Sequence, residues 1–180
     1  RDEMAVITRN VIWNNEFLNT YTDKEKDILG KYSSSLFTLN TFYTANKTIV
    51  GRTIKKDTEK FLLDYWNNVV EHMAQWQELQ HREITKVDLR ESYIATQSIV
   101  IQALGRIGNY YVSHQSEMKD GLQGLERINW SRSAKQWYMR AVGKNGRIIT
   151  SKKAALLISN VIKKELGIAL SAEELNAEEA

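Results

Sequence analysis

The sequence of 180 residues contains no cysteine, no proline and no long apolar run. Without cysteine there is no disulfide, no thiolate zinc ligand and no thiol nucleophile. Without proline, the residue that most reliably ends a helix is missing, so long helices are allowed almost everywhere. No 18-residue apolar stretch and no signal-peptide pattern occurs, so we expect neither a membrane span nor a secretory leader. These absences predict a helical domain that works in water, contacts no membrane and resides in the cytoplasm.

The length suits one substantial domain, and residues 1–180 are expected to form it. The first residue is Arg1 rather than methionine, and a helical pattern starts within three residues of it. We therefore expect a fragment of a longer chain.

Apolar residues recur with helical spacing through the first 112 residues. The pattern predicts helices over 4–18 and 36–50, and a capping box at 22–25 predicts a short helix that ends near Gly30. A second long helix is predicted over 87–112, and its middle is apolar nearly all round, as expected of a central helix. The strongest stripe is predicted to lie on one helix and comprises Leu62, Trp66, Val69, Met73 and Trp76.

The last part of the chain predicts shorter elements and one more strong helix. Helices are expected over 117–127 and 137–141, and Asn145-Gly146 predicts a tiny β-hairpin near residues 142–149. A helix that starts near Thr150 or Ser151 and runs to Leu166 should end at Gly167, and a further capping box opens the tail. The predicted fold is all-α, an irregular multi-helix bundle around one or two long central helices.

The net charge of +3 hides a strong segregation along the chain. Residues 131–167 carry nine basic side chains against the single acidic Glu165, and residues 168–180 form an acidic tail with four glutamates. A basic surface attracts phosphates because each neutralised phosphate releases a condensed counterion. We therefore expect residues 131–167 to bind double-stranded DNA. The alternative is that these charges only solvate helix faces.

The candidate DNA-binding residues come from this basic subregion. Arginine offers paired donors to phosphate or guanine, and a helix start presents free backbone N–H groups. Arg132 or Arg147 is the expected base reader, whereas Lys163 and Lys164 are interpreted as complementing the end of a helix. The predicted set is Arg132, Lys135, Arg140, Lys144, Arg147, Ser151, Lys152 and Lys153.

Other motifs indicate structure rather than chemistry. The Glu78-x-x-His81 spacing suits a pair of metal ligands, but no second pair occurs to complete a site. The small residues of 105–108 are interpreted as allowing close helix packing, and Trp130 and Trp137 as anchors to the core rather than stacking platforms. We therefore predict no catalytic residue, no metal, no cofactor and no enzymatic activity.

Several segments of the sequence resemble one known family. They are Lys31-Tyr32-Ser33-Ser34-Ser35-Leu36-Phe37-Thr38-Leu39, Ala103-Leu104-Gly105-Arg106-Ile107-Gly108-Asn109, Gly124-Leu125-Glu126-Arg127-Ile128-Asn129-Trp130-Ser131-Arg132-Ser133, Trp137-Tyr138-Met139-Arg140-Ala141 and Gly146-Arg147-Ile148. These segments are similar to DndB, the regulatory protein of bacterial DNA sulfur modification (phosphorothioation) systems. The sequence departs from the resemblance at Ala134 and Ala154, where polar residues are expected.

The resemblance implies a role and a missing part. It implies that the chain is the helical C-terminal part of a repressor that binds the promoter of the modification gene cluster. It also implies an upstream region with the family's Asp-Gly-Gln-His-Arg signature. The rival hypothesis is a helical interaction or dimerisation module, with DNA bound mainly by that upstream region. The homo-oligomeric state stays open.

Overall fold

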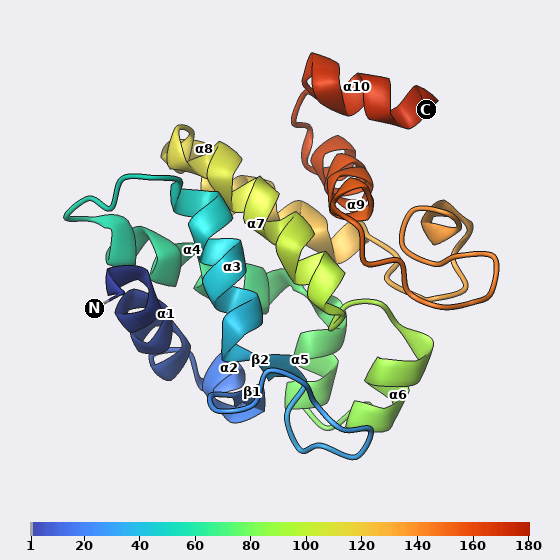
Figure 1. Cartoon of the computed structure of the whole chain (residues 1–180), viewed down its shortest axis with the longest axis horizontal. Helices are drawn as coiled ribbons and strands as arrows, with labels where there is room; N and C mark the ends of the chain where they lie inside the picture. Colours follow the sequence, from blue (N-terminus) through green and yellow to red (C-terminus); the bar gives the residue numbers. More distant parts are fainter. Residues whose placement is uncertain (1) are drawn as a thin grey trace.

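A computed structural model describes residues 2–180, and it confirms the all-α prediction. Within these residues, ten α-helices accompany one two-stranded sheet, and most of the buried apolar side chains form one cluster. Helix α7 runs through the middle, with α3 and α9 packed against it (Figure 1). None of the described helices is long and apolar enough to cross a membrane.

The first predicted helix is two helices. Helix α1 spans Glu3–Trp13 and α2 spans Glu16–Tyr21. The break falls at Asn15, whose side chain accepts a hydrogen bond from the backbone N–H of Leu18 at 3.0 Å and so caps α2. Asparagine favours this position because its side chain replaces the bond that the first helical turn lacks.

The predicted helix over 22–30 is wrong. Strand β1, Thr22–Asp23, pairs in parallel with β2, Phe37–Thr38. The Asp23 carboxylate accepts hydrogen bonds from two following backbone N–H groups, both at 2.9 Å, and closes a turn instead of opening a helix. Helix α3, Leu39–Val50, therefore starts three residues later than predicted, and it ends at Gly51 as expected.

The helix predicted from the apolar stripe also breaks. Helix α4 spans Thr58–His72 and α5 spans Ala74–Gln80, with an extended backbone at Met73 between them. All five side chains of the predicted stripe are nevertheless fully buried. The pattern identified the buried face correctly and missed the bend.

The second long helix is interrupted at Tyr93. Helix α6, Lys86–Ser92, and α7, Ser98–Val112, flank a segment in which Tyr93 forms a β-bridge with Ser131. Helix α7 is the central helix that the sequence predicted. Its glycines confirm the close-packing interpretation, because a Cβ on Gly105 would lie 3.1 Å from a backbone oxygen of α3.

The C-terminal third mixes short helices with a long loop. The predicted helix over 117–127 is α8, Gln115–Gly121, continued by a 3-10 helix, η1, Leu122–Arg127. The predicted helix over 137–141 is wrong, because the helical turn is η2, Lys135–Trp137. The hairpin is reduced to one antiparallel bridge between Val142 and Ile148.

The last two helices match their predictions. Helix α9 spans Lys152–Leu166, starts at the Ser151 cap and ends at Gly167 in the left-handed conformation, with φ 76°. Helix α10 spans Ala172–Glu179 and starts with the predicted capping box, in which Ser171 and Glu174 bond each other's backbone. Helix α10 lies against α9 at the edge of the molecule (Figure 1).

Candidate nucleic-acid interface

The basic subregion is fixed to the core by two tryptophans. The rings of Trp130 and Trp137 stack with centroids 5.4 Å apart, and both side chains are at most 1% exposed. The indole N–H of Trp137 donates to the backbone oxygen of Asn129 at 2.7 Å. The anchoring interpretation is confirmed, and neither ring is available to stack on a base.

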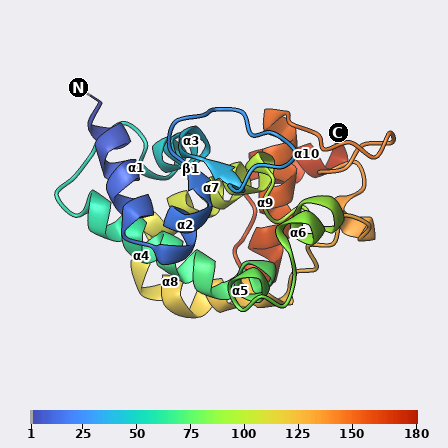
Figure 2. The same cartoon turned by 90° about the horizontal axis from the view of Figure 1, so that it is seen from below.

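The loop after Trp137 is held by its own backbone. Three successive N–H groups, those of residues 140–142, donate to the Trp137 carbonyl, and Met139 adopts a left-handed backbone with φ 64°. Farther along, the N–H of Gly143 donates to the oxygen of Arg147 at 2.9 Å. Lys144 and Arg147 are exposed on this loop, whose conformation the backbone hydrogen bonds define. The loop extends outward at the edge of the molecule before the chain enters α9 (Figure 2).

The start of α9 brings the next three predicted residues together. The hydroxyl of Ser151 accepts a hydrogen bond from the N–H of Ala154 at 3.1 Å. Lys152 and Lys153 occupy the first turn and are exposed. This turn carries no acidic residue. Its remaining N–H groups and two lysines give a locally positive surface that suits an anion.

Arg132 and Lys135 lie at the other end of the loop. Lys135 is exposed, whereas Arg132 is partly buried against the end of α6. The backbone N–H of Arg132 donates to Ser92 at 2.8 Å, and its Nη1 reaches the backbone oxygen of Glu91 at 3.4 Å. Part of the hydrogen-bonding capacity of the guanidinium is thus used within the protein.

Arg140 lies apart from the other predicted residues. Its guanidinium binds the Glu178 carboxylate of α10 with two hydrogen bonds, one of them 2.6 Å long. The hydrogen bond to Glu178 raises the pKa of Arg140, although burial acts in the opposite direction. Lys163, in the last turn of α9, likewise binds a carboxylate of α10, that of Glu174.

A groove between α3, α7 and α9 extends the basic surface. It encloses about 280 Å³ and starts at Ser151 and Lys152. A neighbouring recess of about 280 Å³ contains Lys163 and shares Thr48 and Arg106 with the groove. The residues that line the groove and the recess include three cations and no carboxylate.

Sequence reasoning missed the role of Arg106. The only available signal was one charged side chain inside the apolar pattern of α7. Within residues 2–180, the structure contains no cluster of three or more histidine, aspartate or glutamate side chains that could hold a metal ion.

Comparison with known proteins gives one family. A sequence model of DndB, described as DNA-sulfur modification-associated, matches residues 1–169. No curated protein and no solved structure gives a significant match. The family match spans nearly the whole chain, including the tryptophan anchors, the basic loop and α9. The chain therefore belongs to the DndB family of DNA-sulfur modification-associated proteins.

Proposed function

We propose that this chain is a DNA-binding part of a transcriptional repressor that acts on the promoter of a DNA phosphorothioation gene cluster. The observation that carries the proposal is a set of exposed cations that share the loop and the start of α9. Within residues 2–180 none of the set forms an ion pair. The set is Lys135, Lys144, Arg147, Lys152 and Lys153.

Unpaired cations are available to phosphates without first breaking a protein contact. The lysines and the N–H groups at the start of α9 would hold the DNA backbone and fix its register. Arg147, exposed on a loop of defined shape, is the better candidate for reading a base edge, because Arg132 is partly buried. The family's association with DNA sulfur modification supports DNA as the partner.

Charge reversal at three of these positions tests the proposal. In the variant Lys144→Glu, Arg147→Glu, Lys152→Glu, affinity for promoter DNA should fall at least about tenfold at fixed salt, because phosphate contacts are lost. Fluorescence anisotropy with a labelled promoter duplex measures this affinity. The matched control reverses three exposed cations of the loop between α3 and α4, Arg52, Lys55 and Lys56, on the opposite side of the molecule (Figure 1).

The control has the same net charge as the test variant and should bind DNA as the parent chain does. Equal affinities for the parent, the test variant and the control would refute the proposal. A concentration-dependent dimer without DNA affinity would favour the rival interaction module. The aromatic side chains of α4 and α5 that such a module would expose, Trp66 and Trp76, are fully buried.

A further inference from the structure

Helix α10 docks on the basic subregion through charge rather than apolar packing. Its only fully buried side chain is the carboxyl-bearing Glu174, and its one large apolar side chain, Leu175, is 54% exposed. The helix carries four glutamates and no basic residue. It also follows the last residue matched by the family model, Ala169.

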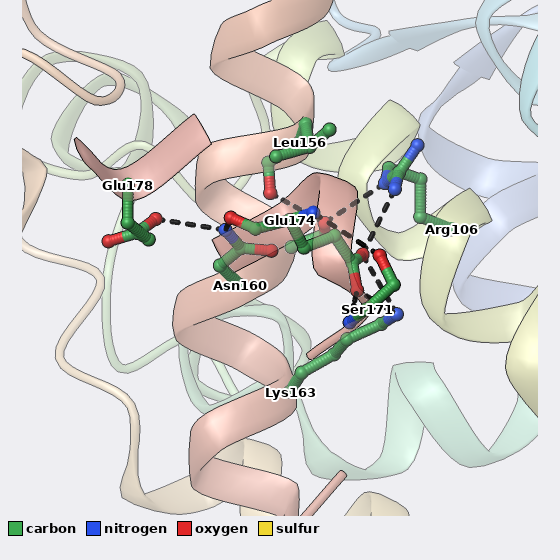
Figure 3. A network of polar contacts seen from close by, with 8 residues as sticks. Arg106, Leu156, Asn160, Lys163, Ser171, Glu174 and Glu178 are labelled. Carbon is green, nitrogen blue, oxygen red and sulfur yellow. Dashed lines mark hydrogen bonds and ion pairs between the residues drawn. The ribbon is translucent and has the colours of Figure 1, made fainter. Parts of the chain in front are cut away.

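Glu174 fills a socket of three donors. Its carboxylate accepts two hydrogen bonds from the Lys163 ammonium, at 2.8 and 2.9 Å, and one from Arg106 Nη2 at 3.0 Å (Figure 3). The backbone N–H of Ser171 donates a fourth hydrogen bond to the same carboxylate, at 2.9 Å. Arg106 is oriented by a hydrogen bond from its Nε to Ser159 Oγ at 3.1 Å. Only 1% of the Glu174 side chain is exposed.

A second socket holds Glu178, one helical turn later. Arg140 binds both of its oxygens. The side-chain amide of Asn160 also donates to it, at 2.9 Å (Figure 3). Asn160 is itself buried, and its amide oxygen has no hydrogen-bond partner within the described residues. The two sockets thus contain Arg106, Lys163 and Arg140, and two carboxylates of one helix face occupy them.

The first socket opens onto the groove that starts at the proposed DNA-binding residues. Arg106 and Lys163 line the recess at one end, and Lys152 lines the groove at the other. A polyanion that follows the groove from Lys152 therefore reaches the cations that Glu174 occupies. Arginine and lysine side chains donate charge-assisted hydrogen bonds to the oxygens of carboxylates and of phosphates alike. A phosphate can therefore take the place of a glutamate carboxylate in such a socket.

We propose that the two sockets on α7, α9 and the basic loop form a second phosphate-binding site for the DNA backbone, which α10 fills and blocks until DNA displaces it. The inference rests on the proposed function. Residues 167–171 link α9 to α10, and Ile168 is buried there. Because Ile168 anchors the start of the link, the proposal has α10 leave its site while α9 stays folded.

Neutralising the two docked glutamates tests the inference. In Glu174→Gln, Glu178→Gln, affinity for promoter DNA should rise at least about tenfold, because up to three cations become available to phosphates. The slope of log affinity against log salt should steepen by about 2 to 3 for the same reason. A chain that ends at Leu170 should show the same rise in affinity and the same steeper slope. This second variant keeps the test valid if the glutamine variant folds poorly.

The matched control is Glu173→Gln, Glu179→Gln, which makes the same change of net charge on exposed positions of the same helix. It should leave the affinity within about twofold and the salt slope unchanged, since neither carboxylate forms an ion pair within residues 2–180 and their loss therefore frees no cation. In the chain that ends at Leu170, Arg106→Ala should remove part of the gain. Hydrogen exchange should show α10 amides losing protection when the parent chain binds DNA.

The outcomes separate the two proposals. If the parent chain binds DNA but the docked-glutamate variant behaves as the control does, the inference is wrong and the proposed function stands. Unchanged protection of α10 in the DNA complex would also overturn the inference. If neither the parent nor the chain ending at Leu170 binds DNA, both proposals are wrong.

Discussion

At the scale of single residues, the best-defined electrostatic feature is the pair of docked glutamates. Burial alone would raise the pKa of Glu174, but hydrogen bonds from Lys163, the Ser171 backbone and Arg106 bring that pKa down to about 2. The hydrogen bond from Arg140 is the main cause that lowers the pKa of Glu178, also to about 2. Both carboxylates are therefore ionised at neutral pH and attract the cations beneath them.

These depressed pKa values predict release of α10 in acid. Because the folded pKa lies below the ordinary value of 4.5, the stabilisation is complete above that pH and is lost as the pH falls toward 2. The side-chain amide signal of Asn160, followed by NMR from pH 6 to pH 2.5, should report the release. In Glu174→Gln, Glu178→Gln this transition should be absent, and its persistence there would contradict the assignment.

At the scale of elements, the fold depends on how closely α7 approaches its neighbours. A Cβ on Gly108 would lie 2.7 Å from Ile49 of α3 and 3.0 Å from Tyr65 of α4. Both neighbouring side chains are fully buried and cannot move into solvent. Glycine at this position therefore sets the distance between α3 and α7.

Enlarging Gly108 should consequently destabilise the protein. Overpacking of a dense core costs typically 1–3 kcal/mol, so Gly108→Val should lower the free energy of unfolding by roughly 2 kcal/mol in urea denaturation. The control Gly30→Val adds the same atoms at a loop position where nothing lies within 4 Å of the new Cβ. It should leave the unfolding midpoint nearly unchanged. Equal midpoints for the two variants would contradict the packing argument.

Local signals predicted the elements whose ends are decided nearby in the sequence. The Ser151 cap, the left-handed Gly167 and the Ser171 capping box act within four residues, and the structure contains all three. The breaks at Met73 and Tyr93 have no such local signal. Tyr93 leaves the helical path to form a bridge with Ser131, a contact that no sequence window can contain.

At the scale of the whole molecule, the charge distribution should govern DNA binding. If about six phosphates are contacted, log affinity should fall with log salt with a slope near −5. Anisotropy titrations between 50 and 250 mM salt, a range of about a factor of five, measure this slope. A slope near zero would mean that the basic loop and the start of α9 do not carry the binding.

The candidate site was only partly predictable for a related reason. Composition identified residues 131–167 as basic, but it counted Arg140 as equal to the exposed lysines and assigned Lys163 only to the end of a helix. In the fold, α10 covers both of them. Glu178, 38 residues farther along the chain, binds Arg140, and Glu174, 11 residues farther along, binds Lys163. Arg106 was not selected, because only the packing of α7 against α9 places it in the groove.

The sequence by itself determined the helical class, the buried stripe of α4 and α5, the caps of α9 and α10, and the segregation of charge. Each of these follows from residue spacing or from contacts within one helical turn. The tertiary structure alone decided where the long helices break, which cations stay exposed and which ones α10 covers. Those outcomes depend on contacts between residues tens of positions apart, whose energies compete with the local preferences and override them.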